Sequence, residues 1–260
     1  MKKYILTLNP DDFVYARALN EFFQKHSGRI DSVCVFPSRA PLLYQLSYYS
    51  AIIRIIGVWD FIPSFIRWNF RALFSHMLAD REEYSIVAAA ERAEIPVRKF
   101  SDVNGEDFIR FVESRKPNGI LNICSQIYKK ASITRLPPIY NFHGGYLPGN
   151  RGRFPQFWAY MKNEPQVLTC HQIDETIDGG HPIYHYRLPL DRSHGVKEMM
   201  EHLMEKFPSI LPHVIELIND GQTETFAIEC ANVYGPQPTS AEIRQYRTAV
   251  ARAKAELKRD

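Results

Sequence analysis

The sequence contains few cysteines, and none of them form the close pairs that metal and redox motifs use. Four occur among 260 residues, with no CxxC pair: Cys34, Cys124, Cys170 and Cys230. Cys124 and Cys170 fall inside apolar runs typical of buried strands. We therefore expect reduced core thiols and a cytoplasmic protein. The start, MKKYILTLNP, has too short an apolar run for a signal peptide and is interpreted as a first buried strand.

Long uncharged hydrophobic runs are also absent. Residues 41–78 are rich in Leu, Ile, Tyr, Phe and Trp, but Arg54, Asp60, Arg67 and Arg71 interrupt them. A spanning helix requires roughly 18 to 20 uncharged residues, so the sequence predicts no transmembrane segment. We expect this insertion to form amphipathic helices that pack on the domain or on a second subunit, in preference to membrane-surface adhesion. A homodimer is thus left open.

Charge of one sign is not concentrated anywhere in the chain. The net charge of +3 arises from 32 basic and 29 acidic residues. Nucleic-acid binding leaves a stronger electrostatic footprint, so we expect no nucleic-acid partner. With 45% hydrophobic and 23% charged residues, the composition is typical of a globular protein with a substantial core. One large domain, or one domain with a short appendix, is expected at this length.

What the sequence does contain is an alternation of short apolar runs and amphipathic segments. Strands are predicted at residues 3–8, 30–36, 97–100, 119–124 and 139–143, with helices at 13–26, 82–93, 102–115 and 153–162. There follow a strand pair at 167–173 and 182–188 around Gly179-Gly180, a helix at 193–218, a strand at 224–228, an extended connector at 234–238 and a helix at 240–258. Pro208 and Pro212 are candidate break points of the long helix, and Asp102 and Ser240 candidate caps. This order predicts an α/β fold with a mostly parallel sheet, whose ligands bind beyond the carboxyl ends of the strands.

Two polar segments stand where predicted strands end. One is Asn141-Phe142-His143-Gly144-Gly145-Tyr146-Leu147-Pro148 followed by Arg151-Gly152, and the other is Ile173-Asp174-Glu175-Thr176-Ile177-Asp178-Gly179-Gly180. Residues two apart in a strand share a face, so Asn141 and His143 project together. Asp178 reaches the imidazole if the two strands are neighbours. An amide, an imidazole and a carboxylate in one pocket are suited to acyl transfer to an amine.

Each of these residues also has a purely structural interpretation. Asn141 fits a turn, His143 a hydrogen-bonded core position and Asp178 an Asp-Gly turn, but their joint spacing favours a functional site. A metal site is the alternative, because His171, Asp178, His181 and His185 crowd a short stretch. No zinc spacing is present there, so we expect no metal.

The pattern NxH followed by LP and RG, and then DExxDGG, resembles the folate-dependent formyltransferase family over roughly residues 85 to 185. That family acts on glycinamide ribonucleotide, on initiator methionyl-tRNA and on nucleotide-linked amino sugars. The resemblance implies a Rossmann-like formyl-transfer domain at residues 1–190 that includes the insertion, with a C-terminal extension at 191–260. It also implies N10-formyltetrahydrofolate as the formyl donor.

The same resemblance assigns roles to individual residues. Asn141, His143 and Asp178 match the catalytic trio of the family. Gln126, Ile127 and Tyr128 match the stretch whose backbone holds the pterin, and Thr176 falls in the opposite wall. Gly144-Gly145 departs from the usual Pro-Ser, which puts a hydroxyl contribution from that loop in doubt. Arg151 and Arg153 either bind a phosphate of the substrate or flank a helix start.

The acceptor amine is approached by elimination. After the first strand this chain has Asn9-Pro10-Asp11-Asp12 in place of a glycine-rich phosphate loop, which disfavours glycinamide ribonucleotide. Only about seventy residues follow the DGG turn, fewer than the extra domain of the tRNA-directed enzymes. The expected acceptor is a nucleotide-linked amino sugar of the GDP- or dTDP-4-amino-4,6-dideoxyhexose type, used in lipopolysaccharide O-antigen. Another small amine such as hydroxyornithine, and a non-catalytic folate or nucleotide binder, stay as alternatives.

Overall fold

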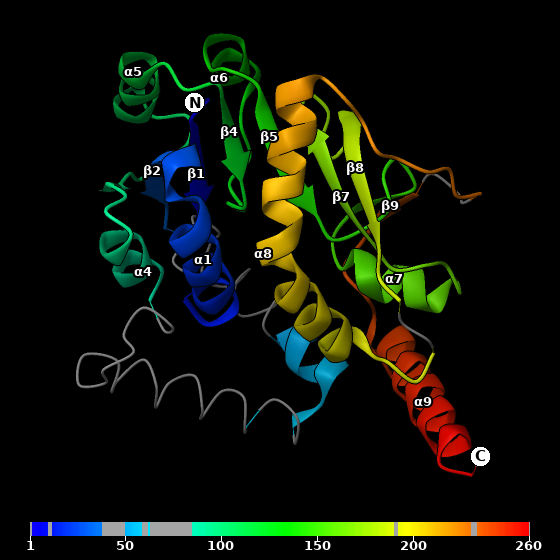
Figure 1. Ribbon diagram of the computed structural model, residues 1–260. Coiled ribbons are helices and arrows are strands. Elements are labelled where there is room, and N and C mark those ends of the chain that lie inside the picture. Colours follow the sequence, from blue (N-terminus) through cyan, green and yellow to red (C-terminus); the bar gives the residue numbers. More distant parts are fainter. Residues whose placement is uncertain are drawn as a thin grey trace.

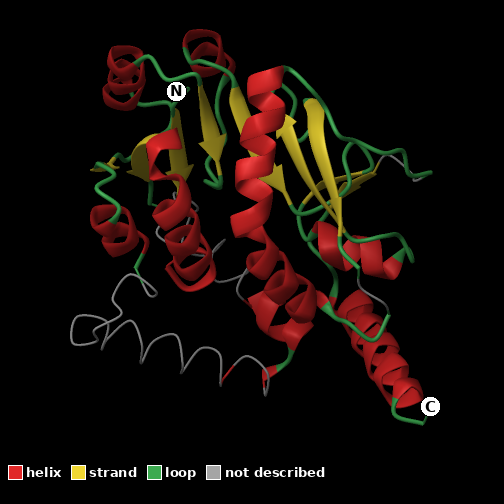
Figure 2. Ribbon diagram, in the orientation of Figure 1, coloured by secondary structure: helices red, strands yellow, loops and turns green. Residues whose placement is uncertain are grey.

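The architecture is a mixed seven-stranded sheet between layers of helices (Figures 1 and 2). A computed structural model describes residues 2–9, 12–37, 50–58, 62, 85–189, 192–229 and 233–259. The strands are β1 (Tyr4–Leu8), β2 (Ile30–Val35), β3 (Val97–Lys99), β4 (Gly119–Asn122), β5 (Ile139–His143), β7 (Val167–Gln172) and β8 (His181–Arg187), in the spatial order β3-β2-β1-β4-β5-β7-β8.

The sheet has a parallel part and an antiparallel part. Strands β3, β2, β1, β4 and β5 are parallel, whereas β7 and β8 run antiparallel to their neighbours. Every residue of β1, β2 and β4 is buried, as expected of central strands covered on both faces. The predicted α/β fold with a mostly parallel sheet is confirmed, and so is the strand pair after residue 166.

Helices cover both faces of the sheet. They are α1 (Asp12–His26), α4 (Ile86–Arg92), α5 (Glu106–Arg115), α6 (Lys130–Arg135), α7 (Pro155–Met161), α8 (Val196–Asp220) and α9 (Ser240–Leu257), with a short 3₁₀ turn, η1 (Ser27–Arg29). Helices α1 and α8 lie across the face seen in Figure 1. Because neighbouring residues of a strand point to opposite faces, Leu6 and Leu121 pack on the α1 and α8 side, and Ile5 and Ile120 on the α5 side.

Helix α8 does not break at its prolines, contrary to the prediction. Pro208 and Pro212 both lie inside one continuous helix. A proline removes one helical hydrogen bond and crowds the preceding turn. Here the buried stripe of α8 compensates for that loss, because Phe207, Leu211 and Ile215 are at most 1% exposed on either side of the prolines.

The strand predicted at 224–228 is also wrong. Only Glu224 makes a ladder contact, through backbone bonds to Ile183 and His185. Two residues further, Nδ1 of the His185 imidazole lies 3.2 Å from the backbone nitrogen and 3.1 Å from the carbonyl oxygen of Phe226, so a side chain takes the place of the next strand partner. The segment predicted as an extended connector instead contains β9 (Val233–Gly235), which pairs with β6 (Asn150–Gly152) in a second small sheet.

The two predicted helix caps are wrong by a few residues. Gly105 is the N-cap of α5, while the Asp102 carboxylate accepts from the Asn104 backbone in the preceding turn. Thr239, not Ser240, caps α9, and Glu242 completes a reciprocal capping box. In both cases a polar residue that favours caps stands close to the true cap.

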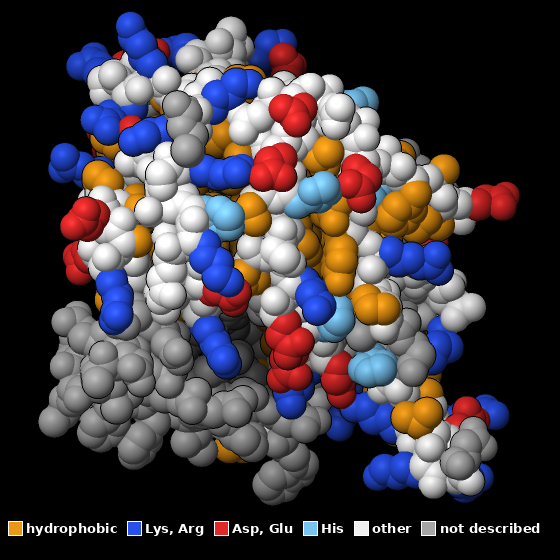
Figure 3. All heavy atoms as spheres, in the orientation of Figure 1, with side chains coloured by type: hydrophobic (Ala, Val, Ile, Leu, Met, Phe, Trp, Pro, Cys, Tyr) orange, Lys and Arg blue, Asp and Glu red, His pale blue; other side chains and the backbone are white. Residues whose placement is uncertain are grey.

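Three of the four cysteines are buried free thiols: Cys34, Cys124 and Cys170. Cys230 and most of the 41–78 insertion lie outside the described residues, although residues 50–56 are helical. No helix in the described part of the chain is both long and apolar enough to span a bilayer. Acidic and basic side chains are interspersed over the described part of the face in Figure 3.

Candidate active site

A cavity of about 520 Å³ opens at the carboxyl ends of β4 and β5. Its walls come from residues 122–128 after β4, from the end of β5, from the start of α7 and from residues 173–178 after β7. This is the edge at which ligands bind in open α/β sheets, and the volume is typical of a small-molecule site. Asn141, His143 and Asp178 all line it.

Strands β5 and β7 are neighbours, which is the adjacency that the sequence required for the trio to meet. Asn141 is the register partner of His171, and His143 of Thr169. The side chain of Asn141 lies between two partners. Its Oδ1 accepts from Asn122 Nδ2 at 2.8 Å, and its Nδ2 lies 3.1 Å from Nε2 of His171.

His171 is a neutral partner for that amide. The ring is 1% exposed, and its pKa is lowered to about 4, mainly by burial and further by the nearby His143 ring. A neutral imidazole accepts at one nitrogen, so Nε2 receives the hydrogen that Asn141 Nδ2 donates. The other ring nitrogen, Nδ1, is buried and has no hydrogen-bond partner among the described residues.

His143 is oriented by the backbone of Asn150. Its Nε2 lies 2.7 Å from the Asn150 carbonyl oxygen, which can only accept, so Nε2 carries a hydrogen. The other nitrogen, Nδ1, lies 3.7 Å from Oδ1 of Asp178. That separation is an ion-pair contact and exceeds a hydrogen bond. The carboxylate therefore faces the imidazole without a hydrogen bond to its Nδ1.

Asp178 is held by the small sheet. Its Oδ2 accepts from the Gly152 backbone N–H at 3.0 Å, and its φ of 52° lies in the left-handed region that aspartate tolerates better than most residues. Strand β6 contributes Gly152, and the turn after β7 contributes the aspartate. The second sheet thus fixes the carboxylate beside the imidazole.

The β4 loop, which we define as residues 123–129, forms one wall. The Gln126 side chain points into the protein, where Nε2 donates to the carbonyls of Pro37 and Ser101. Tyr128 is also buried, 7% exposed, whereas Ile127 is 63% exposed beside the cavity. Three residues of this loop are predicted to contact folate, and among them only Ile127 presents an exposed side chain beside the cavity. Polar contacts from this wall are therefore left to the backbone of the loop.

The β7 loop, which we define as residues 173–180, forms the opposite wall. Thr176 is exposed and donates its backbone N–H to the Asp174 carboxylate. Ile177 is 48% exposed and lines the cavity, as Ile127 does across from it. We call the part of the cavity between the β4 and β7 loops the slot. The two exposed isoleucines give the slot apolar sides, which suits a flat ring.

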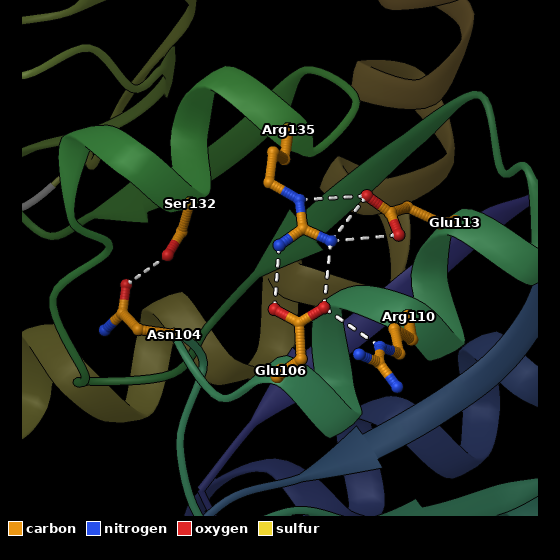
Figure 4. A network of polar contacts seen from close by, with 6 residues as sticks. All are labelled: Asn104, Glu106, Arg110, Glu113, Ser132 and Arg135. Carbon is orange, nitrogen blue, oxygen red and sulfur yellow. Dashed lines mark hydrogen bonds and ion pairs between the residues drawn. The ribbon is translucent and has the colours of Figure 1, made fainter.

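A polar network lies behind the β4 loop (Figure 4). The Asn104 side chain accepts from the Lys129 backbone at 2.7 Å and from Ser132 Oγ at 2.8 Å, and donates to the Ile127 carbonyl at 2.9 Å. Nearby, Arg135 of α6 bonds to both Glu106 and Glu113 of α5. These contacts join the loop to α5 and α6.

The glycine pair that departs from the family pattern has a packing reason. A Cβ atom on Gly145 would lie 2.6 Å from Pro155 Cβ and 2.9 Å from the Asn150 carbonyl oxygen. That carbonyl is the one that orients His143. Gly145 thus allows the backbone to approach the imidazole closely, and no hydroxyl is available from this loop.

The two arginines have different positions. Arg153 lines the cavity, whereas Arg151 is paired within the small sheet opposite Tyr234 and does not line it. The Asn9 side chain ties the ends of two strands together by donating to Phe36 and accepting from Ser125. Pro10 and Asp11 lie outside the described residues. Within the described segments, no cluster of three or more His, Cys, Asp or Glu side chains is placed to hold a metal ion.

Sequence reasoning missed several residues that shape the site. Asn122 contacts Asn141, Asn150 orients His143, and Asn104 holds the β4 loop. One signal was available, because Asn122 is a polar residue inside an otherwise apolar strand, Gly119–Asn122. Asn104 lies in the turn before α5 and Asn150 begins the short strand β6, and each contacts a residue of another segment, which periodicity does not describe.

Comparisons with known proteins agree with the motif resemblance. No family model matches the chain. Over 136 residues it is 23% identical to a methionyl-tRNA formyltransferase from Porphyromonas gingivalis, a match that spans 51% of this chain but only 42% of that relative. A sugar N-formyltransferase from a Shewanella species superposes with a TM-score of 0.56 at 13% identity, over 90% of this chain and 76% of the other.

A third similar protein is an N-formyltransferase from Helicobacter canadensis, solved with folinic acid and dTDP-3-aminofucose. Its TM-score is 0.56 at 15% identity, over 95% of this chain and 80% of the other. Phosphoribosylglycinamide formyltransferases are also among the similar structures. The resemblance drawn from the motifs is confirmed at the level of architecture: the chain has the fold of the folate-dependent formyltransferases.

Proposed function

We propose that this protein transfers a formyl group from N10-formyltetrahydrofolate to the primary amine of a nucleotide-linked amino sugar. The observation that carries the proposal is the convergence of Asn141, His143 and Asp178 on one cavity, with His143 Nδ1 3.7 Å from Asp178 Oδ1. A formyl transfer needs donors for a developing negative charge and a group that takes a proton from the amine. This trio supplies both.

The slot between the β4 and β7 loops fits a folate ring in its chemistry. Ile127 and Ile177 give it apolar sides, and the backbone around Gln126 gives it polar groups. Thr176 lies in the same wall as Ile177. When bound, the folate would supply an activated formyl carbon at the trio.

The residues of the trio have distinct tasks in this proposal. Asn141 Nδ2 donates one hydrogen to His171, which leaves its second hydrogen for the formyl oxygen. Because Nε2 of His143 is bound to Asn150, the ring can donate to that oxygen only from a protonated Nδ1. Asp178 balances the charge of that imidazolium and accepts the amine proton, directly or through a water molecule.

The acceptor is proposed as a GDP- or dTDP-linked 4-amino-4,6-dideoxyhexose, destined for lipopolysaccharide O-antigen. A similar structure holds dTDP-3-aminofucose together with folinic acid. Arg153 lines the cavity and is our candidate for binding the phosphates of such a substrate. Arg151 lies in β6, and we assign it a structural role instead. We propose residues 1–190 as the formyl-transfer domain and 191–260 as its extension.

The test is turnover with a panel of amines. The purified protein and N10-formyltetrahydrofolate are incubated with GDP- and dTDP-linked amino sugars, with glycinamide ribonucleotide and with hydroxyornithine. We expect release of tetrahydrofolate and a formyl mass increment on one amino sugar only. Turnover of hydroxyornithine alone would show that the proposed acceptor is wrong, while the proposed formyl transfer would stand. Folate binding without release on every amine would contradict the enzyme and favour a binding protein.

A further inference from the structure

A row of polar side chains crosses the centre of the sheet on the side of α5. Its members are register partners on adjacent strands (Figure 1), in the order Thr7, Asn122, Asn141 and His171. Two residues before the row, on the same face, the parallel strands β1, β4 and β5 carry Ile5, Ile120 and Ile139. The row is therefore polar within an apolar layer, where every donor and acceptor needs a partner.

The orientation of the Asn122 amide is fixed by the backbone. Its Nδ2 donates to the Cys124 carbonyl at 3.1 Å, and its Oδ1 accepts from the Cys124 N–H at 3.3 Å. A carbonyl only accepts and an N–H only donates, so a flipped amide would lose both bonds. The hydroxyls of Thr7 and Tyr128 also donate to Oδ1, at 2.7 and 3.4 Å, but a hydroxyl can accept as well as donate, so the two bonds to Cys124 are the ones that fix the orientation.

Asn122 passes this orientation to Asn141. The remaining hydrogen on Asn122 Nδ2 is donated to Asn141 Oδ1 at 2.8 Å. If the Asn141 amide flipped, two NH₂ groups would face one another at that distance. The amide nitrogen of Asn141 therefore has to lie on the other side, 3.1 Å from His171 Nε2.

We propose that Asn122 is a positioning residue for formyl transfer, which sets the Asn141 amide with its nitrogen as the donor presented at the site. The inference rests on the proposed function, since it concerns the residue that stabilises charge in that reaction. Asn122 is 3% exposed and acts through Asn141. Preorganised donors stabilise a transition state because they need not reorient during the reaction.

The positioning also determines the tautomer of His171. With Asn141 Nδ2 facing it, Nε2 of His171 accepts, and the ring hydrogen resides on Nδ1, which has no partner among the described residues. The opposite tautomer would place the ring hydrogen on Nε2 and requires a flipped Asn141, whose NH₂ group would then face the NH₂ group of Asn122. Asn122 thus holds His171 in the Nδ1–H tautomer.

Steady-state kinetics test the role. In Asn122→Leu we expect kcat to fall about tenfold to a hundredfold, with the donor KM within about threefold of wild type, because one donor is misoriented but the slot is intact. In Asn122→Asp, only the protonated acid can donate to Asn141, so the loss should deepen as pH rises. This variant keeps the test open if the leucine variant fails to fold.

Two comparisons separate positioning from general destabilisation. Leu121→Ala alters the next residue of β4, whose side chain packs in the cluster on the other face, and it should lower the melting temperature with little change in kcat. In an Asn141→Ala background, Asn122→Asp should have no further effect on kcat. The proposal would be overturned if Asn122→Asp lowered kcat by the same factor in the wild-type and Asn141→Ala backgrounds. It would also be overturned if Leu121→Ala lowered kcat as much as the Asn122 variants do.

Nitrogen NMR of His171 gives a readout that does not require turnover. We expect the Nδ1–H tautomer in wild type and a shift toward the Nε2–H tautomer in Asn122→Leu. If the wild type turns over no acceptor but this shift occurs, the proposed function fails while the positioning stands. An unchanged tautomer in the variant would contradict the positioning whatever the outcome of the turnover assay.

Discussion

The two walls of the cavity are built differently. The β4 loop is held by buried or half-buried side chains that bond to the backbone of other segments: Asn9 to Ser125, Asn104 to Lys129 and Gln126 to Pro37. The β7 loop has a bond within itself, from Thr176 to Asp174, and an exposed ion pair between Glu175 and Lys130. It is anchored to other strands at Ile173, whose backbone N–H donates to the Ile139 carbonyl, and at Asp178, which accepts from Gly152.

This difference extends to the trio. Asn141 is bonded on both sides to buried groups, whereas His143 and Asp178 stand 3.7 Å apart without a hydrogen bond between them. Exposed ion pairs contribute little to stability, so side-chain bonds hold the β7 loop less firmly than the β4 loop. We infer that the amide side of the site is set before substrate binds and that the carboxylate side tightens afterwards.

The largest expected effect on kcat comes from His143 and Asp178, on the carboxylate side of the site. His143→Ala should lower kcat by about 10²- to 10⁴-fold because the formyl oxygen loses a charged donor, and Asp178→Asn by a similar factor because the transfer loses its proton acceptor and the charge that balances the imidazolium. The affinity for the folate, measured by binding titration, should change little, since the β4 loop is untouched. Near-normal turnover in either variant would remove that residue from its role.

A matched pair of loop variants tests the difference between the walls directly. Asn104→Ala removes bonds to Lys129, Ser132 and Ile127, and should raise the donor KM about tenfold, which corresponds to about 1.4 kcal/mol. Asp174→Ala removes the single bond to Thr176 from an exposed side chain and should have a much smaller effect. Equal changes in the donor KM of the two variants would refute the idea that the wall formed by the β4 loop is prearranged.

The last prediction concerns stability rather than turnover, and its dependence on pH on the amide side of the site. Folding lowers the pKa of His171 from 6.5 to about 4, so the unfolded chain binds its proton first as the pH falls. Its contribution to stability is therefore complete well above pH 6.5 and declines toward pH 4, by about 2.5 kcal/mol at pH 4.5. Urea unfolding at several pH values should show a shallower decline in His171→Asn. The same slope in both proteins would show that this ring is not the source.

Several features followed from local chemistry and were predicted correctly. Strands β1, β4 and β5 were found because their apolar runs are short and bounded by turn residues, and α1 because its apolar residues recur at helical spacing. Asn141, His143 and Asp178 were selected from their spacing and from the family resemblance; the structure brings them to one cavity, and their catalytic role stays a prediction. The errors have a common cause. The long helix persists through Pro208 because packing outweighs a lost bond, and residues 225–228 fail to pair because His185 occupies the partner position.

The sequence by itself determined the alternation of strands and helices and the fact that Asn141 and His143 share a face of one strand, because these depend on neighbours in the chain. Only the tertiary structure decided which nitrogen of His143 faces Asp178, and that Asn122 orients the Asn141 amide. Those properties depend on hydrogen bonds between strands far apart in sequence. Burial forces each such polar group to find a partner, and no local pattern specifies which one it finds.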